Sequence, residues 1–425
     1  MFQWKTAQLF TAALAGSLTL AACGGNVAAP IAKAKGINAA AERPAMAAKN
    51  AFAEAPAEII VATDGDKTAA PAVAGGKVLD SFSFRGTTYH LYDVGQKSLI
   101  QRAIASLKGI AGVRHADANI MQYALGAPTS GEAPDDEFFP MQYGMLQKNI
   151  PLAWKVTTGD PNLVVAVVDT GIDYNHPDLK DRVVKGQDFS FRPGRFFNRK
   201  DPNGPMDDNA HGTHCAGIIG ATANNMVGIA GVAPGVKLMA VKVLGKSGGG
   251  TEYDVMKGVA YSITNGAKIV SMSLGGTATT SVERKFYEAA VLSGALVVAA
   301  AGNSADGLGF PAAYPGVLSV GATDSGGGLA RFSNHDQSMS VTAPGVGILS
   351  TIPGETYAKF SGTSMAAPFV AGAAALVWSK HPDWTAEQVK SQIERTAKDM
   401  GAPGPDSIFG HGEIDVTAAL ADERK

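Results

Sequence analysis

Five short runs of almost uninterrupted apolar residues, each closed by a glycine or a polar residue, limit most strongly how this chain can fold. Strands that are buried on both faces have this pattern, so we predict an α/β fold in which a doubly wound, mostly parallel sheet is flanked by helices. In such sheets the ligand crevice lies beyond the carboxyl ends of the strands, which is where Asp169 and Asn303 fall. The five runs are NLVVAVVDTG, KLMAVKVLG, AKIVSMSLGG, ALVVAAAGN and GVLSVGATD.

The charge balance of the 425-residue chain argues against a nucleic-acid partner. Its 36 Lys and Arg side chains are opposed by 38 Asp and Glu, a formal net charge of −2, so no basic surface for a phosphate backbone is expected. Hydrophobic residues make up 45% of the chain, which is enough for a large core and excludes wholesale disorder. The chain has only two cysteines, which excludes a disulfide scaffold.

Residues 1–22 are predicted to be a signal peptide rather than part of the fold. One Lys precedes an apolar stretch, Leu9 to Leu20, that is too short for a comfortable membrane span. The sequence LAAC that ends at Cys23 resembles the bacterial lipoprotein box, in which the signal is cut before the cysteine and the thiol is acylated. The following Gly24 then indicates an exported outer-membrane or cell-surface precursor, held to the membrane by lipid. An ordinary signal peptide cleaved nearby is the alternative.

The rest of the chain divides by composition into four parts. Residues 23–56 are Ala-rich without a sustained period, which is typical of a flexible tether. Residues 57–125 alternate strand-like runs with one segment at helical spacing, SLIQRAIASLKGI, which predicts a small α+β module. Residues 126–137 form a linker, and residues 138–425 contain the five apolar runs. The strand-like runs of the small module are AEIIVAT, GKVLDSFSF, TTYHLYDV and the closing GVRHADANIMQYAL.

Three motifs in the large part carry residues suited to nucleophilic catalysis. VVDTGID puts Asp169 at a strand end, HGTHCAG puts His211 where a loop enters a helix, and GTSMAAP puts Ser364 where an apolar helix begins. A serine hydroxyl is a weak nucleophile until a base takes its proton, and neutral imidazole suits that task near pH 7. A buried carboxylate orients the imidazole and stabilises the imidazolium that forms. The proline of the third motif, Pro368, is expected in the first turn of the helix, where a missing N–H is harmless.

These motifs, in the order Asp, His, Ser, resemble those of the subtilase family of serine proteases, and QYG with HGTHCAG is most similar to its thermitase and proteinase K branches. The resemblance implies a subtilisin-like catalytic domain over residues 138–425 and a secreted, monomeric serine endopeptidase. It implies Asp169, His211 and Ser364 as the catalytic triad. It also implies that the Asn303 side-chain amide and the Ser364 backbone N–H bind the oxyanion.

The resemblance further implies where a protein or peptide substrate binds. An extended peptide is expected to add as a strand between two segments of the catalytic domain, which gives affinity with little demand on sequence. A glycine floor at Gly309, with no acid in its loop, favours large apolar side chains before the scissile bond. The segments on either side of the peptide contribute Gly248, Gly249 and Gly250, and Ser273, Leu274 and Gly275.

The small module, residues 57–125, resembles the subtilase propeptide, a ferredoxin-like domain that assists folding and then blocks the active site. This similarity implies that the chain is a self-cleaving zymogen whose own propeptide is a partner. The cut is expected near Leu125 and Gly126, after which the mature enzyme is free to leave the membrane. The sequence departs from the family after the first strand, because DGDKTAAPAVAGG is rich in Pro and Gly and leaves little room for a helix.

Calcium is the structural cofactor that the resemblance implies. The segment NNMVGIAGVAP is similar to the tight calcium loop of the family, and mixed carboxylate and carbonyl oxygens suit this hard cation. A surface acid is the alternative for Asp136, and a solvated loop is favoured over a second ion site for Asp201, Asp207 and Asp208. The expected ligands are Asp136, Asp178 and Asn225 with the carbonyls of Ala223, Val227 and Ile229.

Simpler explanations exist for each motif taken alone. An Asp before Gly is usually part of a turn, and a Ser before a helix is usually an N-cap. His214 invites a zinc-site interpretation, but no HExxH or CxxC partner set accompanies it, so we expect a structural role. Cys215 is expected to be a packed residue rather than a nucleophile. Two rival functions are an esterase, which would need GxSxG and another residue order, and an inactive subtilase that serves as a surface binding module.

Overall fold

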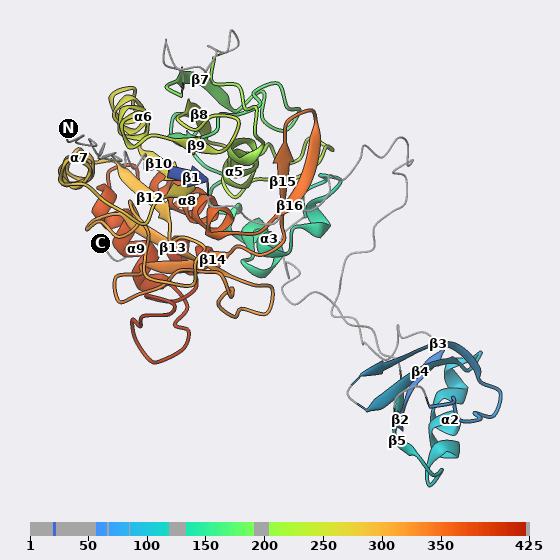
Figure 1. Ribbon diagram of the computed structural model, residues 1–425. Coiled ribbons are helices and arrows are strands. Elements are labelled where there is room, and N and C mark those ends of the chain that lie inside the picture. The colour runs from blue at the N-terminus through green and yellow to red at the C-terminus, as the bar shows by residue number, and fades with distance from the viewer. Residues whose placement is uncertain are drawn as a thin grey trace, which may run out of the picture. The chain divides into compact units, whose positions relative to one another are not determined.

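The computed structural model describes residues 20–22, 57–65, 68–84, 86–118, 133–190 and 204–421 (Figure 1). The chain divides into two compact units, one made of Met1–Asn38 with Ser130–Lys425 and the other of Ala39–Thr129. Cys23, the predicted site of lipidation, lies outside the described residues, as do almost all of the predicted signal peptide and tether and the expected cut near Leu125.

A seven-stranded parallel sheet forms the centre of the larger unit. All five apolar runs are strands of this sheet, which confirms the predicted α/β class. Two further strands, β7 and β14, lie at its edges and were not predicted. In spatial order the strands are β14 (Val341–Pro344), β13 (Leu318–Thr323), β12 (Leu296–Ala300), β10 (Ile269–Met272), β6 (Val164–Asp169), β8 (Lys237–Lys242) and β7 (Val183–Asp188).

Both faces of the sheet are covered by helices. Successive side chains of a strand point to opposite faces, so each buried strand contributes to two separate cores. On β6, Val165 and Val167 belong to the core shared with α5 (His211–Gly220) and α8 (Thr363–Lys380). Ala166 and Val168 belong to the opposite core, under α6 (Glu252–Thr264) and α7 (Ser281–Leu292). Figure 1 shows these helices around the sheet. The strand ends that carry the predicted site therefore rest on a rigid, fully packed centre.

None of the helices in the described residues is long and apolar enough to cross a lipid bilayer. Shorter elements complete the larger unit. These elements are β1 (Leu20–Ala22), η2 (Phe139–Met141), α3 (Tyr143–Gln147), α4 (Ile150–Ala153), β9 (Gly249–Gly250), β11 (Leu274–Gly275), the hairpin of β15 (Ile348–Ile352) and β16 (Thr356–Phe360), α9 (Ala386–Thr396) and α10 (Val416–Ala421).

The expectation that Pro368 occupies the first turn of α8 is wrong. The helix begins at Thr363, so Pro368 is its sixth residue and lies in the helix interior. A proline there cannot donate to the carbonyl oxygen of Ser364. That oxygen instead accepts from the Ser273 hydroxyl at 2.8 Å and from the Cys215 thiol at 3.4 Å. The missing backbone bond thus leaves a carbonyl that ties Ser364 to two neighbouring segments.

The smaller unit is a four-stranded antiparallel sheet with one helix packed on it. Along β2, Ile59 and Val61 are buried while Ile60 between them is 38% exposed, so one face of the sheet forms the core. The described residues between β2 and β3 contain no helix, as their Pro and Gly content predicts. The elements are β2 (Glu58–Asp64), β3 (Lys77–Phe84), β4 (Thr87–Asp93), η1 (Lys97–Leu99), α2 (Ile100–Leu107) and β5 (Val113–Ala118), with the strands in the order β3-β4-β2-β5.

Candidate active site

The carboxyl end of β6 and the first residue of α5 bring an acid and a histidine into contact. Asp169 is the last residue of β6 and His211 opens α5. Nδ1 of His211 lies 2.9 and 3.0 Å from the two carboxylate oxygens of Asp169. Burial disfavours the charged imidazolium, but the neighbouring Asp169 carboxylate more than offsets this and holds the pKa of His211 well above its ordinary value. The pair is therefore arranged so that Nδ1 carries a proton and Nε2 faces elsewhere.

The hydrogen-bond partners of His211 Nε2 and of the Ser364 hydroxyl determine which atoms are available for proton transfer. Nε2 of His211 is buried without a hydrogen-bond partner. Ser364, the second residue of α8, is fully buried, and its hydroxyl donates to the carbonyl oxygen of Ser273 at 3.1 Å. The Cys215 sulfur contacts both residues, at 3.9 Å from His211 Nδ1 and 3.4 Å from the Ser364 carbonyl oxygen. The structure therefore brings all three motif residues to one place, although the Ser364 hydroxyl is bonded to Ser273 in this state.

Asn303 follows β12 and presents an unused donor beside the start of α8. Its side-chain oxygen accepts from the backbone N–H of Thr363 at 2.9 Å and from the Thr363 hydroxyl at 3.0 Å. These two bonds fix the amide so that its nitrogen is directed away from Thr363, and that nitrogen is buried without a partner. The backbone N–H of Ser364 is one of the first in its helix and has no intrahelical acceptor. A Cβ built at Gly362 would lie 3.3 Å from Asn303 Nδ2 and 3.6 Å from the Ser364 backbone nitrogen, so both N–H donors lie beside the start of α8.

His214 and Cys215, on the second turn of α5, are packed residues as expected. The His214 Nε2 lies 3.0 and 3.1 Å from the carbonyl oxygens of Ile348 and Ala358, and its ring stacks on Phe360 at 4.2 Å. Burial lowers the pKa of His214 to about 3, so the ring stays neutral. Burial likewise raises the pKa of the Cys215 thiol, which makes it a poor nucleophile.

The acidic loop before α5 differs from the expectation of a solvated cluster. Asp207 is only 5% exposed, and Asp208 forms an ion pair with the buried Lys242 at 2.6 Å. Asp201 lies outside the described residues. The burial of Asp207 could not be predicted from the spacing of residues along the chain, because most of its hydrogen-bond donors are backbone N–H groups.

The two segments predicted to hold a substrate already flank a third strand. β9 and β11 both pair antiparallel with β1, in the order β11-β1-β9. Ala21 lies opposite Gly275 on one side and Gly249 on the other. The gap between β9 and β11 therefore has the width and backbone groups to accept one extended chain. Gly248, before β9, has a φ of 78°, which favours glycine.

Gly309 lies between the SLGG and AAGN segments. Its N–H donates to the carbonyl oxygen of Ala301, and its neighbour Phe310 exchanges backbone bonds with Gly276. A Cβ added at Gly309 would lie 3.2 Å from the Gly276 carbonyl oxygen and 3.5 Å from that of Ala301. Only a residue without a side chain leaves this space open.

Two acids predicted to bind calcium converge on one loop. Asp136 and Asp178 are both fully buried. Asp136 accepts from the backbone N–H groups of Asn224 and Asn225, and Asp178 accepts from the Asn225 amide at 2.9 Å. Burial, with the nearby Asp136 charge, raises the pKa of Asp178 to about 6. The alternative that Asp136 is a surface acid is wrong, because Asp136 is enclosed by this loop.

Carbonyl oxygens of the same loop are also available. Within the described part of the chain, those of Ala223, Val227 and Ile229 accept no hydrogen bond. Asn224 and Met226 have φ values of 59 and 60°, so the loop is tightly curled. Two buried carboxylates beside free carbonyls form a donor set of the kind that calcium prefers.

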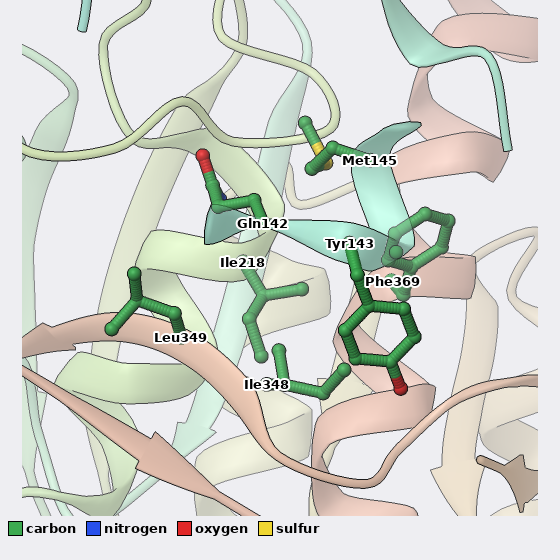
Figure 2. Close-up of a pocket in the computed structure, with 8 residues that line it drawn as sticks. Gln142, Tyr143, Met145, Ile218, Ile348, Leu349 and Phe369 are labelled. Carbon is green, nitrogen blue, oxygen red and sulfur yellow. The ribbon is translucent and has the colours of Figure 1, made fainter. Parts of the chain in front are cut away.

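A separate apolar pocket lies beneath the QYG segment (Figure 2). Gln142 is anchored to both backbone groups of Ala230, and the Tyr143 hydroxyl donates to the Val346 carbonyl oxygen at 2.8 Å. None of the three catalytic-motif residues lines this pocket, so it is no part of the candidate site. Its lining consists of Gln142, Tyr143, Gly144, Met145, Ile218, Ile348, Leu349 and Phe369.

Comparisons with known proteins agree with this geometry. The subtilase family matches residues 160–412. Subtilisin E of Bacillus subtilis (strain 168) is 37% identical over 352 residues, which cover 81% of this chain and 83% of that protein. Subtilisin of Bacillus pumilus is 42% identical over 282 residues, 65% of this chain and 98% of the relative. The thermophilic serine proteinase of Bacillus sp. (strain AK1) is 39% identical over 322 residues, 76% of each chain.

Proposed function

Because the chain belongs to the subtilase family and is a serine endopeptidase of the subtilisin type, we propose that Asp169, His211 and Ser364 are its catalytic triad. The observation that carries this assignment is the pairing of His211 Nδ1 with the Asp169 carboxylate, at 2.9 and 3.0 Å. It leaves the other imidazole nitrogen buried and without a partner, and α5 packs against α8, whose second residue is Ser364.

In the reaction, Ser364 Oγ attacks the carbonyl carbon of the scissile peptide bond while His211 Nε2 takes the hydroxyl proton. Asp169 keeps the imidazole in the correct tautomer and stabilises the imidazolium. The tetrahedral intermediate collapses as His211 returns the proton to the leaving amine, which gives an acyl-enzyme. A water molecule, deprotonated by His211, then attacks the ester, and Ser364 is regenerated.

The oxyanion of both tetrahedral intermediates accepts hydrogen bonds from Asn303 Nδ2 and from the Ser364 backbone N–H. The buried, unpartnered state of Nδ2 supports this role, because a donor without an acceptor is costly unless a ligand supplies one. The two bonds from Thr363 hold the amide in place before substrate arrives. The donor is thus preorganised for charge that develops only during the reaction.

Substrates bind as a central strand between β9 and β11, through Gly248, Gly249 and Gly250 on one side and Ser273, Leu274 and Gly275 on the other. The antiparallel pairing of β1 with both segments supports this mode. Backbone bonds dominate such a site, so the specificity is broad. Gly309 leaves a pocket for a large apolar side chain before the scissile bond, which favours Leu, Phe, Tyr and Met.

The smaller unit acts as the propeptide of a self-cleaving zymogen. The match to subtilisin E supports this role, because it covers 81% of this chain and so is longer than residues 130–425. The match therefore extends into the smaller unit. Self-cleavage is placed near Leu125 and Gly126, and N-terminal sequencing of the mature enzyme tests it. A mature chain that starts before about Gly112 would contradict the propeptide assignment.

Calcium is the structural ion of the mature enzyme, held by Asp136, Asp178 and Asn225 with the carbonyls of Ala223, Val227 and Ile229. The ion would neutralise two buried carboxylates that otherwise repel each other. Export through the N-terminal signal, with lipid on Cys23 and an outer-membrane or cell-surface location before processing, completes the proposal. The released enzyme is a monomer.

Digestion of casein by the processed protein and by its Ser364→Ala variant tests the triad. We expect the substitution to abolish digestion and to leave the precursor at full length. A matched control is Ser281→Ala, which removes an exposed hydroxyl at the start of α7 and should behave as wild type. Undiminished casein digestion by Ser364→Ala would exclude the triad and favour another nucleophile.

A further inference from the structure

The buried carboxylate of Asp207 organises the loop that leads into α5. Its Oδ1 accepts the backbone N–H groups of Asn209 and Ala210 at 2.9 and 3.1 Å. Its Oδ2 accepts both the backbone N–H and the hydroxyl of Thr213, at 2.9 and 2.6 Å. Four donors, two from the residues just before the helix and two from Thr213 in its first turn, therefore converge on one side chain.

The same carboxylate also reaches the strand that ends in Asp169. The hydroxyl of Thr170 donates to Asp207 Oδ1 at 2.9 Å and accepts from the backbone N–H of Gly212 at 2.9 Å. The backbone N–H of Thr170 in turn donates to Asp169 Oδ1 at 2.6 Å. A continuous set of hydrogen bonds thus joins the end of β6 to the first turn of α5.

The residue before His211 shows that the helix start is held under constraint. Ala210 has a φ of 105°, in the left-handed region that residues with a side chain rarely adopt. Its backbone N–H is one of the five groups bound by Asp207. The direction in which the chain enters α5, and with it the place of the imidazole, is therefore set by contacts rather than by backbone preference.

We infer that Asp207 is a positioning residue for the catalytic pair: through Thr170 and Thr213 it fixes the end of β6 against the start of α5, and so holds Asp169 and His211 in contact. Asp207 contacts neither the Ser364 hydroxyl nor the imidazole in the described structure. Its role is to hold the end of β6 and the start of α5 in fixed positions relative to each other. This inference rests on the proposed triad.

The expected consequence follows from how steeply catalysis depends on alignment. A displacement of about 1 Å at a catalytic group costs up to a hundredfold in rate. If the contact between Asp169 and His211 loosens, the imidazolium loses stabilisation and its proton leaves at lower pH. The other groups that face His211 are Cys215, whose thiol stays protonated, and His214, which stays neutral. Neither of them changes charge in the pH range over which His211 loses its proton.

Variants of Thr170 leave the charge of the site unchanged, so they separate the positioning of Asp169 and His211 from the electrostatic effect of losing the Asp207 charge. Thr170→Val keeps the shape of the side chain but removes both hydroxyl bonds, while Thr170→Ser keeps the hydroxyl. Asp207→Asn is a second variant. It replaces one carboxylate oxygen, which accepts hydrogen bonds, with an NH₂ group that cannot accept them. The measurements are kcat and KM per titrated active site, kcat/KM against pH, and the melting temperature of each processed enzyme.

We expect Thr170→Val and Asp207→Asn to lower kcat about tenfold, to change KM little, and to move the acid limb of the pH profile to lower pH. Thr170→Ser should restore values near wild type. Equal kcat and equal acid limbs in Thr170→Val and Thr170→Ser, with only the melting temperature lowered, would overturn the inference. Ser364→Ala, measured alongside, distinguishes that result from failure of the triad itself, which would show as retained hydrolysis in this variant.

Discussion

The imidazole of His211 turns Nδ1 toward both oxygens of the Asp169 carboxylate and leaves Nε2 buried with no hydrogen-bond partner. The contact joins residues that are 42 positions apart. It explains why the pKa of the buried His211 is raised, while the pKa of the fully buried His214, with no acid beside it, is lowered. One carboxylate thus distinguishes two histidines on consecutive turns of α5.

The first prediction concerns pH. His211 must be neutral to accept a proton, and its pKa is raised well above 6.5, so activity is lost on the acid side as His211 gains a proton. We expect the acid limb of kcat/KM to have its midpoint above pH 6.5. In Asp169→Asn the midpoint should move to lower pH, and kcat should fall by about 10⁴, as for this change in chymotrypsin-type enzymes. An acid limb that is the same in both enzymes would contradict the assignment.

A second prediction concerns the oxyanion donor. Asn303→Ala removes the unpartnered amide nitrogen, and we expect kcat to fall about a hundredfold or more with little change in KM. The magnitude is that of subtilisin, where loss of the corresponding donor costs about 2.7–4 kcal/mol. Steady-state kinetics on a soluble peptide, with a thermal melt as the control for folding, measures it. An unchanged kcat would remove Asn303 from the site.

Most of the central sheet could be predicted from sequence because its inner strands are buried on both faces. The two strands that were missed lie at the edges, where the pattern weakens. In β7, Val184 is 36% exposed and Gly186 interrupts the run, and β14 has only four residues and ends in Pro344. An edge strand lacks one neighbour, so fewer of its positions need apolar side chains.

The motif residues could be located from the sequence, but their supports could not. Asp207 looked like part of a solvated acidic loop, because three of its five donors are backbone N–H groups, which leave no trace in residue identity. Pro368 looked like a helix-start residue, since its spacing from Ser364 does not reveal that Ser273 and Cys215 take over the freed carbonyl. Long-range contacts of this kind exist only in the folded chain.

Pocket size gives the third prediction. Gly309→Val adds a side chain whose Cβ would lie 3.2 Å from the Gly276 carbonyl oxygen, so the floor of the pocket is raised. We expect kcat/KM for substrates with Phe before the scissile bond to fall roughly tenfold or more relative to substrates with Ala. The Ala substrate is the internal control. In the unmodified enzyme, faster cleavage after Lys or Arg than after Leu or Phe would contradict the apolar pocket.

Calcium gives the fourth prediction. Adding calcium to chelator-treated mature enzyme should raise its melting temperature, because an ion that binds only the folded state at a hundred times its Kd adds about 2.7 kcal/mol. Asp178→Asn should abolish most of this increase by removing a buried ligand charge. Asp181→Asn, on an exposed residue nearby, is the matched control. If calcium stabilises Asp178→Asn as much as wild type, the ion lies elsewhere.

Covalent labelling tests the central claim, that separated segments converge to make the Ser364 hydroxyl a nucleophile. The mature enzyme is treated with a fluorophosphonate until activity is lost, and the modified peptide is identified by mass spectrometry. We predict one adduct, on Ser364, and its loss in His211→Ala, where no base activates the hydroxyl. Complete inactivation with Ser364 unmodified, or with the adduct on another serine, would contradict the account.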